Sequence, residues 1–199
     1  REALLALGPT FIKLGQLLST RVDILPREYI EELSLLQDNV PGFSGDVAAR
    51  VIEEELGAPP EELFDTFSRE PFAAASLGQV HRATRRGKEL VVKVQRLGLR
   101  ELFAVDLANL RTLVRVLDAL DKSDDGTKRD WTAIYDQSAK LLYKEIDYEA
   151  EAQNGLRFRD NFRNRPWITV PDFYEDLTTK RVVTMAYVPG IQIPDVGDI

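Results

Sequence analysis

The chain has 199 residues, a formal net charge of −7 at pH 7 and a charged content of 30%. This acidic balance argues against general nucleic-acid binding, which needs a basic face. Cysteine is absent and His81 is the sole histidine, so the sequence excludes a disulfide framework and argues against a zinc site. No apolar run approaches the ~20 residues that span a bilayer. A helical pattern from the first residue, without an initiator Met, predicts that the chain is a segment of a longer protein.

The first third of the chain has a helical pattern. From Leu4 onward, apolar side chains recur every three or four positions and form one stripe. Ser44 is placed to cap a later helix that ends at Gly57. We therefore expect residues 1–65 to form a helical extension that precedes a second unit over residues 66–199.

The second unit begins with a change of pattern. Three short β segments are expected near residues 67–74, 79–85 and 89–95, because runs of β-forming residues are bounded there by turn-forming ones. Residues 98–121 have the apolar spacing of an amphipathic helix. The pattern thus predicts a small sheet followed by a helical insert.

The remaining elements are a long helix and a hairpin. Asp130 is placed to cap a helix that runs to about Arg163. Residues 167–174 and 181–188 have the pattern of two paired strands. The predicted fold class is α+β, with an antiparallel sheet and a long helix between its third and fourth strands.

Lys93 is a lone lysine in the apolar strand Leu90–Val94. An ammonium group is costly to bury without an anionic partner. Triphosphate oxygens and a nearby carboxylate would supply that partner. The alternative is an ordinary outward-facing lysine, because strand alternation places Lys93 on the face opposite Leu90 and Val92.

A run of small residues, Ala73–Gly78, precedes the strand that leads to Lys93. Small side chains let backbone N–H groups approach phosphate oxygens, which is the role of a glycine-rich loop in nucleotide sites. Alanine allows fewer backbone conformations than glycine, so this loop should be stiff. The alternative is that the alanines serve close packing alone.

Three carboxylates, Glu145, Asp147 and Glu151, lie together on the predicted long helix. A phosphate-binding strand lysine needs a helical carboxylate as its partner, and we assign this role to Glu151. Asp147 shares a helix face with Glu151, being four residues away, whereas Glu145 lies well round the helix. The alternative is a solvated acidic face.

A fourth pattern lies in the first helical stretch, at Lys13-Leu14-Gly15-Gln16. Gly15 inside a helix costs ~1 kcal/mol relative to alanine, which indicates close packing or a functional approach. Lys13 and Gln16 are three residues apart and project together. The alternative is the polar edge of an amphipathic helix.

Together these patterns resemble the signature motifs of the UbiB family, the aarF-domain atypical kinases associated with isoprenoid-quinone and prenyl-lipid metabolism. The resemblance covers nearly the whole chain, and the flanking sequence looks most like chloroplast and cyanobacterial members. In chain order the motifs are Lys13-Leu14-Gly15-Gln16, Ala73-Ala74-Ala75-Ser76, Val92-Lys93 and Glu145-Ile146-Asp147.

The resemblance implies a protein-kinase-like N-terminal lobe whose helical extension folds over the cleft. It implies a nucleotide site, with ATP or ADP as ligand, formed by Ala73, Ala74, Ala75, Ser76, Val80, Lys93, Glu151, Tyr187 and Val188. It also implies a regulatory set that couples the extension to this site, formed by Lys13, Gln16, Glu145 and Asp147. Catalytic residues and Mg²⁺ ligands are expected in a C-terminal lobe outside this chain, so the chain alone is expected to be inactive.

The expected function is that of the nucleotide-binding lobe of an atypical kinase or ATPase in prenyl-quinone metabolism. The expected partners are a nucleotide and a prenyl lipid or membrane surface, in a chloroplast, or alternatively in cyanobacterial cytoplasm or a mitochondrion. Two other readings remain open: a non-catalytic pseudokinase scaffold or lipid-binding accessory protein, and an unrelated helical adaptor with a small sheet.

Overall fold

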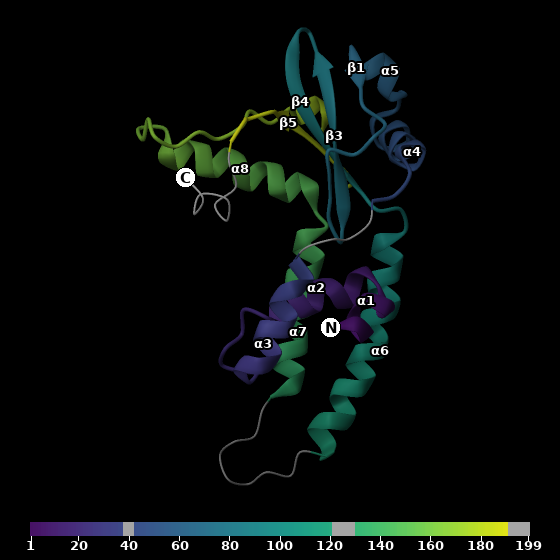
Figure 1. The fold of residues 1–199 in the computed structure, drawn as a ribbon, viewed down its shortest axis with the longest axis vertical. Coiled ribbons are helices and arrows are strands. Elements are labelled where there is room, and N and C mark those ends of the chain that lie inside the picture. The colour runs from purple at the N-terminus through teal and green to yellow at the C-terminus, as the bar shows by residue number, and fades with distance from the viewer. Residues whose placement is uncertain (38–41, 121–129, 191–199) are drawn as a thin grey trace.

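The computed structural model describes residues 1–37, 42–120 and 130–190. The helices are α1 (Glu2–Leu7), α2 (Pro9–Leu18), α3 (Arg27–Ser34), α4 (Gly45–Leu56), α5 (Pro60–Leu63), α6 (Leu99–Leu120), α7 (Trp131–Glu145) and α8 (Tyr148–Phe162), with 3₁₀ turns η1 (Leu35–Gln37) and η2 (Glu175–Leu177). The strands are β1 (Thr66–Phe67), β2 (Ala73–Ala74), β3 (Gly78–Arg85), β4 (Lys88–Gln95) and β5 (Val182–Ala186). Figure 1 shows the sheet in the upper half, with α4 and α5 on one side and α8 on the other, and the remaining helices in the lower half.

The N-terminal helical pattern forms two helices instead of one continuous helix. Gly8, with φ 99°, separates α1 from α2, and Pro9 occupies the first position of α2. Glycine tolerates this positive φ, and proline is favoured at the first helical position. The break turns α2 so that it packs across α7 and α6 (Figure 1).

The predicted caps of α4 are confirmed. The Ser44 side chain accepts a hydrogen bond from the Asp46 N–H at 3.2 Å, and Gly57 ends the helix in the left-handed conformation with φ 78°. Helix α4 packs on the sheet through Ala48, Val51 and Ile52. The expected boundary at residue 65 remains a prediction.

The sheet is antiparallel, with strand order β1-β3-β4-β5 and β2 paired to β3. Strands β3 and β4 form a hairpin whose turn places Arg86 and Gly87 at φ 52° and 72°. Two positive φ values match the twist of a tight hairpin. Each of the three predicted β segments therefore contributes to the sheet, although the first is divided into β1 and β2.

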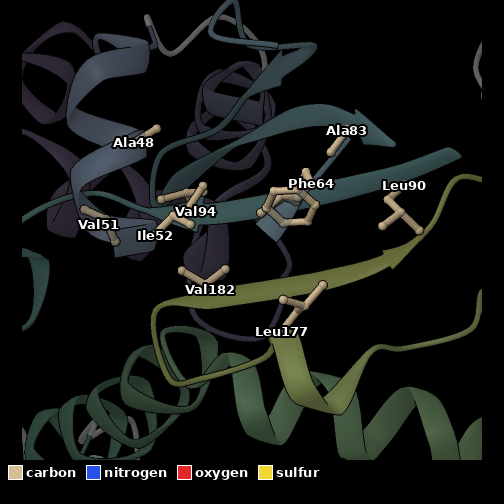
Figure 2. Packing of buried hydrophobic residues seen from close by; sticks show 10 residues of the cluster. Ala48, Val51, Ile52, Phe64, Ala83, Leu90, Val94, Leu177 and Val182 are labelled. Carbon is tan, nitrogen blue, oxygen red and sulfur yellow. The ribbon is translucent and has the colours of Figure 1, made fainter. Parts of the chain in front are cut away.

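One face of the sheet holds the main hydrophobic core. Leu90, Val92 and Val94 of β4 point into it together with Val182 of β5. Figure 2 shows the rest of this core, in which α4, Phe64 and Leu177 of η2 surround these strand side chains. Strand alternation then directs Lys93 to the opposite face.

A second core joins the helical half to the end of the sheet. It contains Leu77, Leu99, Phe103, Leu107, Leu142 and Ile146, with Leu17 of α2 packed against it. Asp118 of α6 accepts hydrogen bonds from the backbone N–H groups of Trp131 and Thr132, at 3.0 and 3.1 Å, and so ties α6 to α7.

The prediction of one helix from Asp130 to Arg163 was wrong. Asp130 does cap a helix, since its carboxylate accepts from the Ala133 N–H at 2.7 Å, but that helix ends at Glu145. Asp147 caps the separate helix α8 by accepting from the Ala150 N–H at 3.0 Å. An aspartate stabilises a helix start more than a helix interior. The chain turns at this point, and α8 packs against β5 and extends to one side of the sheet (Figure 1).

The predicted C-terminal hairpin is only partly present. Residues 181–188 supply strand β5, whereas residues 167–174 contribute a single isolated bridge between Phe173 and Met185. Pro171 lacks the N–H that a continuous ladder requires. Of the helices that the structure describes, none is both long and apolar enough to cross a membrane.

Candidate functional site

Lys93 and Glu151 form the ion pair predicted from the sequence. The Lys93 Nζ lies 2.9 Å from Oε1 and 2.7 Å from Oε2 of Glu151. The Lys93 side chain is 29% exposed and that of Glu151 is 38% exposed, so both charges still reach solvent. Because α8 begins at Tyr148, directly after its cap Asp147, Glu151 lies in the first turn of the helix, where it contacts Lys93 of β4. The pairing holds the ammonium group in place on the open face of the sheet.

Tyr148 lies beneath this pair. It is fully buried, and the Lys93 Nζ lies 4.5 Å from the centre of its ring. A cation over an aromatic ring is attracted by the negative face of the ring. Sequence reasoning missed Tyr148, although an aromatic residue directly after Asp147, in the middle of the acidic cluster, was a usable signal.

A cavity of about 500 Å³ opens beside Lys93. It lies between the sheet, the helical extension and the end of α7. The cavity is lined by Lys13, Gln16, Leu17, Thr20, Ala74, Ala75, Ser76, Leu77, Gly78, Lys93, Glu145 and Tyr148. Two lysines, Lys13 and Lys93, therefore face one space.

The structure gathers only part of the predicted site in this cavity. The predicted residues at its walls are Lys13, Gln16, Ala74, Ala75, Ser76, Lys93 and Glu145. The predicted residues outside its lining are Ala73, Val80, Asp147, Glu151, Tyr187 and Val188. Glu151 nevertheless acts on the cavity through its contact with Lys93.

The alanine-rich segment is a short strand followed by a tight turn. Ala73 and Ala74 pair with Val80 and Gln79 of β3, and the Ala75 N–H donates to the Gly78 carbonyl at 2.8 Å. Arg96 fastens the turn from below, because its Nε donates to the Ser76 carbonyl at 3.0 Å. These hydrogen bonds secure the turn in this conformation, and the stiffness of the loop remains a prediction.

Gly78 is required by its surroundings. A Cβ at this position would lie 2.5 Å from the Val94 carbonyl oxygen and 2.6 Å from the Tyr148 hydroxyl. Contacts this short are not seen for real Cβ atoms, so a larger residue would displace the backbone. Gly78 thus lets the turn lie directly over Tyr148.

The extension reaches the cavity through Lys13. Its Nζ lies 2.8 Å from Oε2 of Glu145, the last residue of α7. Gln16 instead donates to the Leu36 carbonyl at 2.8 Å and so secures η1. Gly15 allows this packing, because a Cβ there would lie 2.5 Å from the Leu36 side chain. The predicted docking of the extension is therefore present.

The expectation that Asp147 and Glu151 share one helix face was wrong. Asp147 is the residue before α8, and its carboxylate is used to cap that helix. Glu145 belongs to α7, so the three carboxylates serve three different contacts. The break between α7 and α8 separates them, since it redirects the chain within two residues.

Tyr187 lies at the far end of the same sheet face, and Val188, the next residue, is exposed. The Tyr187 N–H donates to the Glu89 carbonyl at 3.0 Å, and its ring stacks on the Arg82 guanidinium at 4.2 Å. Val80 shares this face, because it stands opposite Lys93 in the ladder. These residues mark a second region, continuous along the sheet with the Lys93 region.

His81 belongs to the core and not to this site. It is fully buried on the other face, where its ring contacts the Gln79 amide at 2.9 Å and the Ser68 carbonyl at 2.7 Å. Burial lowers the pKa of His81 below its ordinary value of 6.5, so the ring is held neutral.

Comparison with known proteins places this geometry in a family. The profile of the ABC1 atypical kinase-like domain matches residues 35–199. ACTIVITY OF BC1 COMPLEX KINASE 8 of Arabidopsis thaliana, a chloroplastic protein, is 55% identical over 97% of the chain, which covers 25% of that protein. The Synechocystis protein sll1770 is 50% identical over 97% of the chain, which covers 33% of it. These relatives support a chloroplast or cyanobacterial origin, and the chain spans about a quarter to a third of their length.

A solved structure shares the fold. The complex of Rv3197 with erythromycin from Mycobacterium tuberculosis superposes with a TM-score of 0.66 at 29% identity, covering 92% of this chain and 45% of that one. The predicted α+β, kinase-like fold class is thereby confirmed. The domain profile and the identities to its members show that the chain belongs to the ABC1, or aarF-domain, family of atypical kinases.

Proposed function

We propose that this chain is the nucleotide-binding part of an atypical kinase or ATPase that acts in isoprenoid-quinone or prenyl-lipid metabolism. The observation that carries the proposal is the Lys93–Glu151 ion pair beside the cavity. In kinase-type sites, a strand lysine held by a helical carboxylate binds the α- and β-phosphates. The atypical kinase class of the domain supports the same role here.

The charges at the cavity suit a polyphosphate. Lys93 is partly exposed and retains donor positions beyond those used by Glu151. Lys13 adds a second ammonium group at the cavity, where Glu145 pairs with it at 2.8 Å and offsets part of its charge. The base of ATP or ADP then lies along the sheet towards Val80, Tyr187 and Val188, at the end of β5.

Magnesium is the metal that such a nucleotide would bring. When bound, Mg²⁺ neutralises phosphate charge during transfer. Within the described ranges there is no group of three or more His, Cys, Asp or Glu side chains that could hold a metal ion. We assign its ligands to the remainder of the longer protein, and we expect this part alone not to transfer phosphate.

The physiological setting is part of the proposal. The chloroplastic and cyanobacterial relatives favour a plastid or cyanobacterial protein. A prenyl lipid or a membrane surface is the proposed partner besides the nucleotide. The alternative function is a non-catalytic scaffold, and the experiment below distinguishes it from an active kinase or ATPase.

The test is nucleotide binding and hydrolysis by the full-length protein, with and without prenyl-lipid vesicles. Lys93→Met should remove ADP affinity while a thermal melt stays unchanged, because the variant keeps the apolar stem and loses the charge. Lys88→Met is the matched control, since Lys88 is an exposed lysine of the same strand. ADP binding without hydrolysis or phosphate transfer would favour the scaffold, and unchanged affinity of Lys93→Met would contradict the proposal.

A further inference from the structure

The Tyr148 hydroxyl is a buried polar group without a hydrogen-bond partner among the residues that the structure describes. The residue itself is fully buried. Buried polar groups in proteins are almost always hydrogen-bonded, and an exception requires an explanation. In the described ranges, one other buried side chain, Thr184, shares this property.

The hydroxyl lies where the alanine-rich turn meets β3. It would be 2.6 Å from a Cβ on Gly78, so it stands directly under the backbone of that residue. The ring of Tyr148 forms part of the cavity wall and supports the Lys93 Nζ at 4.5 Å. One side chain therefore touches the turn, the strand lysine and the cavity.

Packing alone does not account for the oxygen. The ring contacts Ala152 and Val183, which are apolar, and a phenylalanine would make the same contacts. Burial and the nearby charges of Glu151 and Glu145 raise the pKa of the Tyr148 hydroxyl, so it remains protonated and acts as a donor. The described protein groups supply no acceptor for this donor.

We propose that Tyr148 is a nucleotide-binding residue whose hydroxyl donates a hydrogen bond to a phosphate oxygen held beside Lys93. The inference rests on the proposed function. Phosphate oxygens are strong acceptors, and the adjacent ammonium group is the natural place for them. Gly78 covers the hydroxyl, so the phosphate reaches it when the turn over residues 75–78 lifts. The hydrogen bonds from Arg96 to the turn set the resistance to that movement.

The test compares ADP with adenosine, which lacks the phosphates, on the full-length protein. Tyr148→Phe should weaken ADP binding roughly tenfold, the effect of one hydrogen bond to a charged group. Adenosine binding, followed by ligand-observed NMR, should not change. The melting temperature should stay the same or rise, because the variant removes an unpaired buried hydroxyl without altering the packed ring.

Thr184→Val is the matched control. Thr184 is also buried and unpaired, but it stands opposite Val92 in the ladder and therefore on the core face. This variant should bind ADP like the parent protein. An equal loss of ADP and adenosine binding in Tyr148→Phe, or no loss, overturns the inference.

Lys93→Met separates the two proposals. If Lys93→Met loses ADP and Tyr148→Phe does not, the proposed function stands and the role of Tyr148 is wrong. If the parent protein binds no ADP, both are wrong.

Discussion

The two faces of the central sheet use the same strands for different purposes. On one face, β4 buries Leu90, Val92 and Val94 against α4 in the main hydrophobic core. On the other face, the same strand presents Lys93 to a carboxylate and to a cavity. The comparison teaches that side-chain alternation lets one strand stabilise the fold and carry the site, with little interference between the two roles.

The largest expected effect is on stability, and it tests whether β4 has a core face and a site face by comparing two neighbouring valines. Val92→Ala should lower the free energy of unfolding by about 2 kcal/mol, because two buried methyl groups and the contacts around them are lost. Val91→Ala, on the half-buried face, should cost less than half as much. Chemical denaturation measures both. Equal losses would contradict the assignment of a core face and a site face.

The next effect is a dependence of stability on pH, caused by a histidine buried on the core face. His81 is neutral in the folded protein because burial lowers its pKa below 6.5. Below that value the unfolded chain binds a proton that the folded chain does not, so stability should fall as the pH decreases through 6.5 and should be restored above it. His81→Gln should flatten this dependence in melts between pH 5 and pH 8. A pH profile identical to that of the parent protein would show that another group is responsible.

A smaller effect is expected from the ion pair on the site face. Glu151→Gln removes the charge and keeps the shape, and both partners are partly exposed, so the free energy of unfolding should change by less than about 1 kcal/mol. ADP affinity should nevertheless fall, because Lys93 is no longer held by a charged partner. Glu149→Gln is the control from the first turn of the same helix. A large loss of stability with unchanged ADP binding would make the pair structural.

The smallest effect should come from the pair between the extension and α7. The Lys13–Glu145 pair is partly exposed, so a double-mutant cycle on these two residues should give a coupling of about a few tenths of a kcal/mol. Apolar contacts, including Leu17 against the second core, supply most of the docking. Strictly additive single and double variants would show that the contact contributes nothing to holding the extension over the cavity.

Local pattern was sufficient for much of the fold. The caps at Ser44 and Asp130, the three β segments and the helix over 98–121 could all be predicted, because each depends on neighbouring residues alone. The Lys93–Glu151 contact was also predictable, once a lysine in an apolar strand was read as needing an anionic partner.

The division of the predicted long helix was harder to foresee. Residues 144–151 have an unbroken helical pattern. From local sequence alone, Asp147 could either continue one long helix or cap a new one, because the two conformations have similar local free energies. What decides between them is whether α8 can reach the open face of the sheet while α7 packs on α6. Contacts of Tyr148 and Ala152 with Val183 settle this, and they join residues far apart in the chain.

The sequence by itself determined the α+β pattern of helices and strands and the order of the motifs, since both follow from residue type and spacing. The resemblance of those motifs to the UbiB family singled out Lys93 as the strand lysine. The tertiary structure alone decided which motif residues share the cavity, that Gln16 secures η1 and that Tyr148 lies beneath Lys93. The physical reason is the distance along the chain over which each effect acts. Helix propensity and strand alternation act over a few residues, whereas the site depends on the packing of α2, α8 and β4, which lie far apart in the sequence.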